Sequence, residues 1–355
     1  MNNFRGSYKN IDDVEFLVTL IEPELTDIKT KEANIREGVH YSEMISPEYE
    51  PSKEYLEVFY KALELNKKRV AKDILTLSNE IRNHNKPILV SLLRAGTPIG
   101  VLLKQTLKRV FNIDAPHYSI SIIRDREIDI NALNYIIQKH PNSRLIFVDG
   151  WTGKGVIKRE LDYFIDRYNR EFNQNLSSEL FVLSDIAGVA DFSGGYDDYL
   201  IPSSALNSTV SGLVSRSILS DKYIKDNEFH GVKFYKEYLP LDVSNLYIDT
   251  IIEEVIKIDI NQTPPIYQKD TKIAKDMKNY IKSIQDRFNI SNINYIKPGI
   301  GETTRVLLRR DPYLILVQNL EDISLSHIIK LAKEKSIKII EERELPYKAV
   351  GIIKE

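Results

Sequence analysis

Short apolar runs alternate with segments of helical periodicity between residues 52 and 184. Apolar residues return at intervals of three and four over residues 52–83, which predicts one or two amphipathic helices covering a sheet. Further strands are predicted at residues 87–93, 118–123, 144–148 and 180–184, and further helices at residues 97–110, 131–139 and 156–173. Strand and helix in alternation predict an α/β fold with a mostly parallel sheet and helices on both faces.

A second, smaller pattern begins after a break near residue 268. The paired prolines at residues 264–265 cannot continue a helix or a central strand, so a linker is predicted there. Beyond it, helices are predicted at residues 272–288, from residue 301 and at 324–335, and strands at 293–296, 313–317, 337–340 and 349–353. These elements predict a small C-terminal α/β sandwich. The chain is therefore divided into an irregular lead-in (1–50), a main domain (51–268) and a C-terminal domain (269–355).

Composition narrows the chemistry open to the chain. The absence of cysteine excludes disulfides, thiolate metal sites and a thiol nucleophile, and the scattered histidines predict no protein-built metal site. No apolar run approaches the ~20 residues of a membrane span, and the N-terminus lacks a signal-peptide pattern, so we expect a cytoplasmic protein. Residues 271–355 carry 16 Lys+Arg against 11 Asp+Glu, a net +5, while the remainder carries −7. An anionic partner is therefore expected at the C-terminal end.

Three loops follow predicted strands: Arg94-Ala-Gly, residues 149–155 and residues 184–188. Ligands of parallel sheets bind at the carboxyl ends of the strands, so these loops are predicted to form one composite site. In the first loop, an arginine could bond two oxygens of a phosphate; the alternative is a helix entry with a surface arginine.

The second loop carries the most information. A buried strand delivers Asp149 to a loop rich in glycine and hydroxyl groups, and a helix starting at Val156 would turn its backbone N–H groups toward an enclosed anion. It is not a nucleotide-triphosphatase loop, because Val148 stands where that motif requires glycine and Gly155 replaces the hydroxyl that would hold magnesium. The layout predicts a sugar-phosphate site.

The segment Asp149-Gly-Trp-Thr-Gly-Lys-Gly resembles the phosphoribosyl pyrophosphate (PRPP) motif of phosphoribosyltransferases, although Gly150 stands where a second acid is usual. The resemblance implies that the loop holds the 5′-phosphate and that Asp149 orients the ribose, with Mg²⁺ carried by the substrate nearby. It also implies a pyrophosphate loop at Arg94 and a mobile flap with two arginines. The implied catalytic residues are Asp149, Arg94, Arg124 and Arg126, and the implied PRPP-binding residues are Ala95, Gly96, Thr97, Gly150, Trp151, Thr152, Gly153, Lys154 and Gly155.

Longer stretches point to a narrower group. LLRAGTPIGVLLK, HYSISIIRDREIDINAL, FVDGWTGKG, LIPSSALNSTVSGLVSRS and FHGVKFY resemble the phosphoribosyltransferase-like proteins encoded beside tellurite-resistance genes in bacteria, a stress-linked family. This resemblance covers roughly residues 35–250. Some members carry a cysteine-protease label, and a chain without cysteine cannot perform that chemistry.

The acceptor pocket is predicted from less specific signals. Asp185 follows a strand and could bind a base-like acceptor, or simply cap the next turn. Residues 203–216 are predicted to line the pocket, with an ordinary capped helix as the alternative. The acceptor candidates from this segment are Asn207, Ser208, Thr209 and Arg216. Trp151 is predicted either to pack in the core or to stack against a base. The histidines, including His117 and His230, are predicted to have structural roles.

The C-terminal domain offers a candidate RNA interface. A helix is predicted to open with glycines and hydroxyls and then to present arginines, an arrangement that attracts a phosphate backbone. Its start resembles the L7Ae and pelota RNA-binding fold, with Gly301 in place of the usual asparagine. The implied RNA-binding residues are Gly299, Gly301, Glu302, Thr304, Arg305, Arg309 and Arg310. The alternative is a structural helix in a docking domain.

Two functions follow from these resemblances. The first is transfer of a phosphoribosyl group from PRPP to a base-like acceptor, coupled to RNA binding. The second is a non-catalytic RNA-binding regulator that senses PRPP or a nucleotide. A phosphoribosyltransferase is the expected enzyme class, Mg²⁺ the expected cofactor, and no membrane partner is expected. The sequence leaves a homo-oligomer open.

Overall fold

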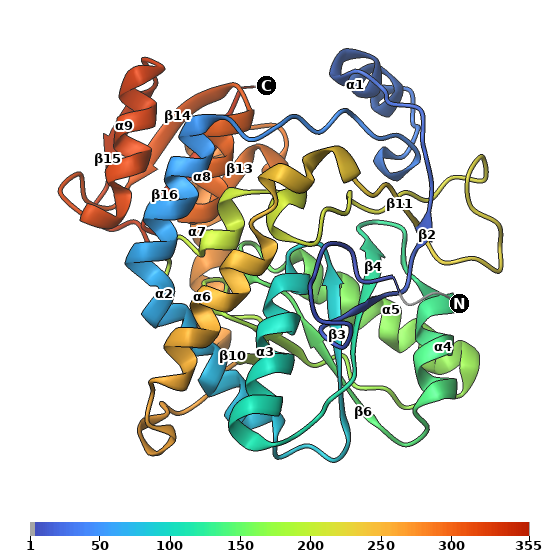
Figure 1. The fold of residues 1–355 in the computed structure, drawn as a ribbon. Coiled ribbons are helices and arrows are strands. Elements are labelled where there is room, and N and C mark those ends of the chain that lie inside the picture. The colour runs from blue at the N-terminus through green and yellow to red at the C-terminus, as the bar shows by residue number, and fades with distance from the viewer. Residues whose placement is uncertain (1–3, 355) are drawn as a thin grey trace.

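The computed structural model describes residues 4–354, and an eight-stranded sheet lies at its centre (Figure 1). The strands follow the order β1-β4-β3-β6-β8-β10-β12, and β5 pairs with β4 off this path. All neighbours from β1 to β10 are parallel, whereas β12 and β5 run antiparallel to their partners. The bounds are β1 Glu15–Phe16, β3 Pro87–Leu93, β4 His117–Ile123, β5 Glu127–Ile128, β6 Arg144–Val148, β8 Leu180–Val182, β10 Phe192–Ser193 and β12 Tyr267–Gln268. The predicted α/β class with a mostly parallel sheet is confirmed.

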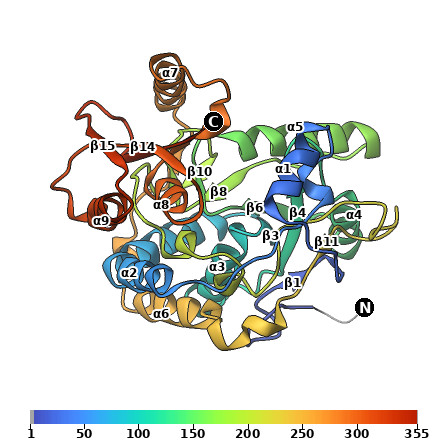
Figure 2. The ribbon, with the colours of Figure 1, turned by 90° about the horizontal axis from the view of Figure 1, so that it is seen from above.

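Helices cover both faces of this sheet (Figure 2). The side chains of β3 show why: Val90 and Leu92 point into the core under α4 and α5, while Leu89 points into the core under α2, α3 and α6. This alternation is the two-residue period of a strand buried on both faces. The bounds are α2 Lys53–Ile81, α3 Gly96–Phe111, α4 Ile130–Lys139, α5 Val156–Phe172 and α6 Ser244–Ile256.

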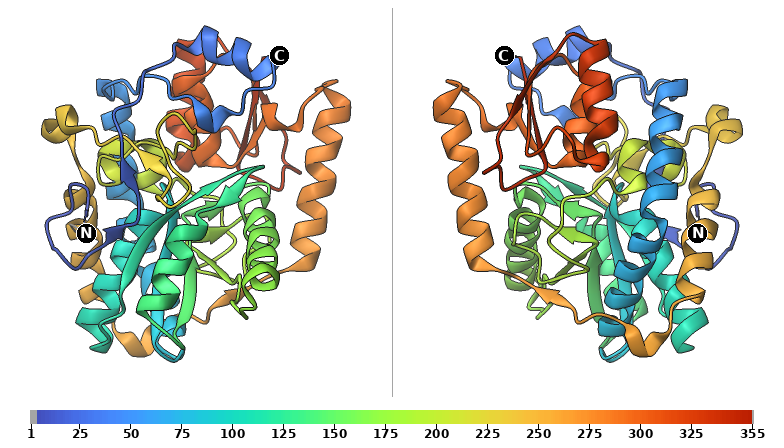
Figure 3. Two further views of the ribbon diagram at one scale, coloured as in Figure 1. Left: turned by 90° about the vertical axis from the view of Figure 1, so that its right-hand side faces the viewer. Right: turned by 90° about the vertical axis from the view of Figure 1, so that its left-hand side faces the viewer.

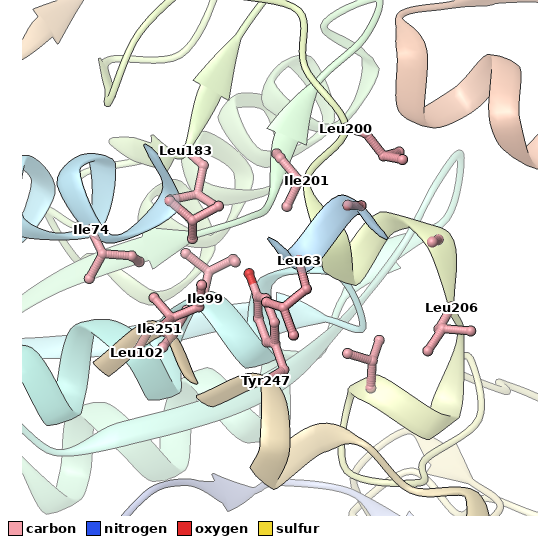
Figure 4. Close-up of a cluster of buried hydrophobic side chains, with 14 of the residues drawn as sticks. Leu63, Ile74, Ile99, Leu102, Leu183, Leu200, Ile201, Leu206, Tyr247 and Ile251 are labelled. Carbon is pink, nitrogen blue, oxygen red and sulfur yellow. The ribbon is translucent and has the colours of Figure 1, made fainter. Parts of the chain in front are cut away.

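The larger core lies under α2, α3 and α6 (Figure 4). The figure shows Ile74 of α2 and Leu102 of α3 meeting Ile251 of α6, and all three side chains are fully buried. Burying a side chain of this size stabilises the fold by about 1.5–3 kcal/mol. Residues 52–83, for which we predicted one or two helices, form the single helix α2 because the apolar stripe continues without a break.

The segment before α2 is only partly irregular. β1 joins the central sheet at its edge, and a second short strand, β2 (Thr19–Leu20), pairs with β11 (Gly231–Val232). The helix α1 (Ile28–Arg36) and the 3-10 helix η1 (Tyr41–Glu43) follow. Segments far apart in sequence therefore meet beside the central sheet.

The chain ends in a small mixed sheet with helices, in the order β13-β16-β14-β15. Where a strand was predicted at residues 293–296, the chain forms the 3-10 helix η6 (Ile293–Tyr295) before β13 begins, because the Asn292 side chain accepts a hydrogen bond from the Asn294 N–H. The bounds are α7 Thr271–Arg287, β13 Ile296–Pro298, α8 Ile300–Arg309, β14 Pro312–Val317, η7 Ile323–Leu325, α9 Ser326–Glu334, β15 Lys338–Glu341 and β16 Ala349–Ile353.

Residues 4–268 are called the N-terminal part here, and residues 269–354 the C-terminal part. The two parts share buried surface, since Ile300 and Leu307 of α8 belong to the same core as α2 and α6. α7 lies along the outer edge of the molecule (Figure 3).

Within residues 4–354, no helix combines the length and the apolar character that a membrane crossing requires. The remaining bounds are β7 Trp151–Thr152, β9 Ser184–Asp185, η2 Pro202–Ala205, η3 Ser208–Val210, η4 Lys236–Leu241 and η5 Ile260–Gln262.

Candidate functional site

A cavity of about 340 Å³ lies where the N-terminal and C-terminal parts meet, and this volume falls in the range of small-molecule sites. The N-terminal part contributes the loops after β3 and β6 and the end of β4, and the C-terminal part contributes η6, β13 and α8. We call it the shared cavity. It is lined by residues 92–95, Ile122, Arg124, Asp149, residues 151–158, Leu180, Asn294, Lys297, Pro298, Glu302 and Arg305.

The first two predicted loops meet at this cavity because β3 and β6 are parallel neighbours whose carboxyl ends lie together. Arg94 of the first loop and Thr152 of the second both line it. Gly96 makes the approach feasible: a Cβ atom at this position would lie 2.2 Å from the Val148 carbonyl oxygen. Any larger residue at position 96 would push the two loops apart.

The second loop forms a cradle of backbone donors. Gly155, the N-cap residue directly before α5, has φ +70°, a left-handed conformation that glycine adopts without strain. Within residues 4–354, the N–H groups of Gly153 and Lys154 donate no hydrogen bond, and the first turn of α5 has no intrahelical acceptors. Such N–H groups at a helix start favour an anion.

The Thr152 hydroxyl supports the loop. It donates to Asp185 Oδ1 at 2.5 Å and accepts from the Ala187 N–H at 3.0 Å, so both its donor and an acceptor site are engaged. Asp185 in turn accepts from the Ala190 N–H at 2.8 Å and is fully buried. Asp185, predicted at the acceptor pocket, is therefore placed beneath the shared cavity, where it fixes the loop that carries Thr152.

Asp149 follows β6 and lines the cavity, and its Oδ1 accepts a hydrogen bond from the Gly150 N–H at 2.8 Å. Burial raises the pKa of Asp149 to about 7, although that hydrogen bond and the charge of Arg305 oppose the rise. The carboxyl group is therefore only partly ionised near neutral pH.

Asp149→Asn tests this environment. Because the folded-state pKa lies above the ordinary value, Asp149 contributes stability that is present at low pH and lost as pH rises through about 7. The melting temperature of the variant, measured relative to the wild type, is expected to be higher at pH 8 than at pH 5. An identical difference at both pH values would contradict the raised pKa.

Cationic side chains dominate the cavity walls. Burial, together with the nearby Lys297 and Arg124, lowers the pKa of the Lys154 ammonium to about 8. Burial also lowers the pKa of Lys297, and the Glu302 carboxylate only partly offsets its cationic neighbours. Among the described lining residues, Asp149 and Glu302 are the only carboxylates. The cavity thus holds positive charge that an anionic ligand would compensate.

Arg94 is already paired. Its guanidinium donates to Glu48 Oε2 at 2.8 Å, and the two side chains are only 19% and 15% exposed. Glu48 Oε1 also accepts from the Ser208 N–H at 2.8 Å. Burial alone would raise the pKa of Glu48, but Arg94 and these hydrogen bonds hold it below its ordinary value. Sequence reasoning missed Glu48, because no local pattern links it to a loop 46 residues away.

Several predicted residues lie away from the shared cavity. Arg126 donates to Ser42 Oγ at 2.9 Å and to the Leu219 carbonyl at 3.0 Å, and Arg216 donates to the Tyr41 carbonyl at 2.9 Å. Thr97 is buried, with its hydroxyl 2.7 Å from Ser119 Oγ. The acceptor candidates Asn207, Ser208 and Thr209 lie in and beside η3, and none of them lines the cavity.

The start of α8 faces the N-terminal part. The Ile300 N–H donates to Asp198 Oδ1 at 2.8 Å, Arg305 Nε donates to the Ser204 carbonyl at 3.0 Å, and Arg309 Nη2 donates to the Ala205 carbonyl at 3.0 Å. A Cβ atom on Gly299 would lie 2.8 Å from Ile186, and one on Gly301 would lie 3.0 Å from Ser204 Oγ. Thr304 is buried within the C-terminal part, 2.8 Å from His327 Nε2. Of the predicted RNA-binding residues, Arg310 is exposed.

Two buried serine–histidine pairs also occur. Ser91 Oγ lies 2.7 Å from His117 Nε2, and Ser121 Oγ lies 2.8 Å from His230 Nδ1, whose Nε2 is 3.2 Å from Glu127. Both serines are fully buried, and neither lines the shared cavity. They therefore offer no accessible nucleophile. The Glu127 partner of His230 was not foreseen, because the β4–β5 hairpin creates the contact.

Comparisons with known proteins give the chain a family. Residues 6–252 match the family described as "Tellurite-like stress resistance cysteine protease StiP", and residues 275–355 match the PELOTA RNA binding domain. The chain is also 36% identical over 367 residues to "Cysteine protease StiP" of Acinetobacter baylyi, an alignment that covers 99% of this chain and 94% of that protein.

These matches correct the expected enzyme class. The family and the full-length relative are named as cysteine proteases, so the prediction of a phosphoribosyltransferase is wrong. This chain has no cysteine, so the name of the relative identifies no nucleophile here. The chain belongs to the StiP family of tellurite-like stress resistance proteins and carries a C-terminal pelota RNA-binding domain.

Proposed function

We propose that this protein is a non-catalytic RNA-binding regulator whose shared cavity takes PRPP or a nucleotide. One observation carries the proposal: a single cavity joins the donor-rich loop of the N-terminal part to the wall formed by Lys297 and Arg305 of the pelota domain. The loop supports a phosphate ligand because it resembles a PRPP motif and leaves backbone donors free. RNA binding is inferred from the pelota domain.

Charge supports a phosphate ester over a neutral ligand. The N–H groups of Gly153 and Lys154 and the Lys154 ammonium would bind one phosphate, and Arg124 and Arg305 lie on the same lining to meet further negative charge. Mg²⁺ would arrive with the ligand, because no three His, Asp or Glu side chains within residues 4–354 group into a metal site. A single carboxylate beside phosphate oxygens is a common setting for Mg²⁺, and Asp149 offers one.

The cavity lies between the two parts of the chain, and this position would allow the pelota domain to respond to a bound ligand. A ligand that touches both parts stabilises one arrangement of the pelota domain over others, and ligand binding is then thermodynamically linked to the state of that domain. Lys154 already connects the parts, since its Nζ donates to the Ile293 carbonyl at 2.7 Å.

Calorimetric titration with PRPP and Mg²⁺, followed by nucleotides, tests the proposal. Lys154→Gln is expected to weaken binding at least tenfold, about 1.4 kcal/mol, because it removes a charge from the phosphate cradle. Wild-type binding at pH 8 should take up protons, since an anion raises the lowered pKa of Lys154. The uptake is measured by repeating the titration in buffers of different ionisation enthalpy.

Lys236→Gln is the matched control, because Lys236 is exposed on the N-terminal part and does not line the cavity. It should bind like the wild type. Failure of PRPP and all nucleotides to bind the wild-type protein would reject the cavity assignment, whatever the RNA affinity.

A further inference from the structure

The outer face of α7 carries a row of four lysines, Lys272, Lys275, Lys278 and Lys282, which we call the α7 lysine stripe. At 3.6 residues per turn its members fall within about a third of the helix circumference, along roughly 15 Å of axis. All four side chains are exposed, and none makes an ion pair or a hydrogen bond with another residue between positions 4 and 354. Asp276 lies off the stripe, and Asp286 lies one turn beyond its end.

The opposite face of α7 holds the helix in place. Ile281 and Ile284 are buried against the small mixed sheet. Asp270 caps the helix start by accepting hydrogen bonds from the next N–H groups, and its own N–H donates to the Gly188 carbonyl at 3.2 Å. The lysines are therefore exposed on a fixed helix, and this helix lies along the outer edge of the molecule (Figure 3). Packing accounts for the inner face of α7 and gives no reason for the lysines on the outer one.

Much of the surface that the pelota resemblance assigns to RNA is engaged by the N-terminal part, although Arg310 is exposed and Glu302 and Arg305 line the shared cavity. The guanidinium groups of Arg305 and Arg309 bind backbone carbonyls of η2, and the Ile300 N–H at the start of α8 binds Asp198. An RNA strand that bound these groups would have to replace hydrogen bonds that join the two parts. A pelota domain that binds RNA in this arrangement needs another basic surface.

We infer that RNA binds the C-terminal part along the α7 lysine stripe, through its phosphate backbone. The inference rests on the RNA-binding half of the proposed function and names the surface involved. Four ammonium groups on one rigid face complement a polyanion, and contacts of this kind fix position without reading sequence. The stripe lysines do not line the shared cavity, so RNA and the cavity ligand can be bound at the same time.

Replacing all four stripe lysines by glutamine in the full-length protein tests the inference. Binding of single-stranded RNA is measured by fluorescence anisotropy over a series of salt concentrations. Each lost phosphate contact lowers the slope of log K against log salt by about 0.7, so the variant should lose roughly 3 units of slope. Its affinity should fall at least tenfold at low salt.

The control variant carries the same change in charge on the N-terminal part: Lys53, Lys68, Lys225 and Lys236, all exposed and without ion pairs among the described residues, become glutamine. It should keep most of the wild-type slope. Equal slopes for the stripe variant and the wild type would overturn the inference, as would a loss of binding in Arg305→Ala/Arg309→Ala alone. The inference also fails if the stripe variant loses binding to phosphatidylserine vesicles while keeping RNA affinity. A wild-type protein that binds no RNA at low salt rejects the RNA half of the proposed function as well.

Discussion

Arg94→Ala is expected to lower the free energy of unfolding by about 3–5 kcal/mol, because it leaves Glu48 buried without its counter-charge. The remaining partner of that carboxylate, the Ser208 N–H, cannot replace a full positive charge. The same change removes a cation from the shared cavity, so PRPP binding should also fall. Urea denaturation and calorimetry measure the two effects separately.

The double variant Arg94→Ala/Glu48→Ala separates the structural role of Arg94 from its binding role. Removing both charges leaves no unpaired ion, so the double variant should be more stable than Arg94→Ala alone. Its PRPP affinity should stay low, because the cavity still lacks the guanidinium. A double variant no more stable than the single one would show that the ion pair is not what Arg94 contributes to folding.

Asp198→Ala is expected to loosen the C-terminal part from the N-terminal part. Asp198 accepts hydrogen bonds from the Ile300 N–H at 2.8 Å, at the start of α8, and from the Lys348 N–H at 2.9 Å, just before β16. Burial raises the pKa of Asp198 to about 6, against the effect of these bonds. Two donors left without an acceptor cost about 2–6 kcal/mol in total.

The neighbouring Asp197→Ala is the control. Asp197 is 75% exposed and pairs with Arg69 at the surface, a contact worth about 0–1 kcal/mol. Thermal unfolding of Asp198→Ala should separate into two transitions, with the pelota domain released at lower temperature, while Asp197→Ala unfolds like the wild type. A single, unshifted transition in Asp198→Ala would argue against its role in joining the parts.

The sheet and its loops could be predicted because their signals are local. Periodicity located β3, β6 and α5, and the rule that parallel strands carry ligands at their carboxyl ends predicted that Arg94 and Thr152 would meet. The structure places both on one cavity. The end of a strand and the glycines of the following loop can be recognised in a short stretch of sequence, without knowledge of how the rest of the chain packs.

Long-range partners could not be predicted in the same way. Glu48 and Asp198 act on groups 46 and 102 residues away, and such pairings depend on how whole elements pack. The resemblance to a pelota domain describes that domain in isolation, so it carried no information about what covers α8. Likewise, no pattern in residues 203–216 predicted that the carbonyls of Ser204 and Ala205 would accept hydrogen bonds from the arginines of α8.

The hydrogen bond from Lys154 to the Ile293 carbonyl and the mixed lining of the cavity have a consequence for how the chain can be divided. A fragment ending near residue 268 would retain the loop after β6 but lose the cavity wall that contains Lys297 and Arg305. The complementary fragment would retain that wall without the loop. Under the proposed function, recognition of the small molecule therefore requires the intact polypeptide, in which the stretch from α6 to α7 connects the two halves of the binding site.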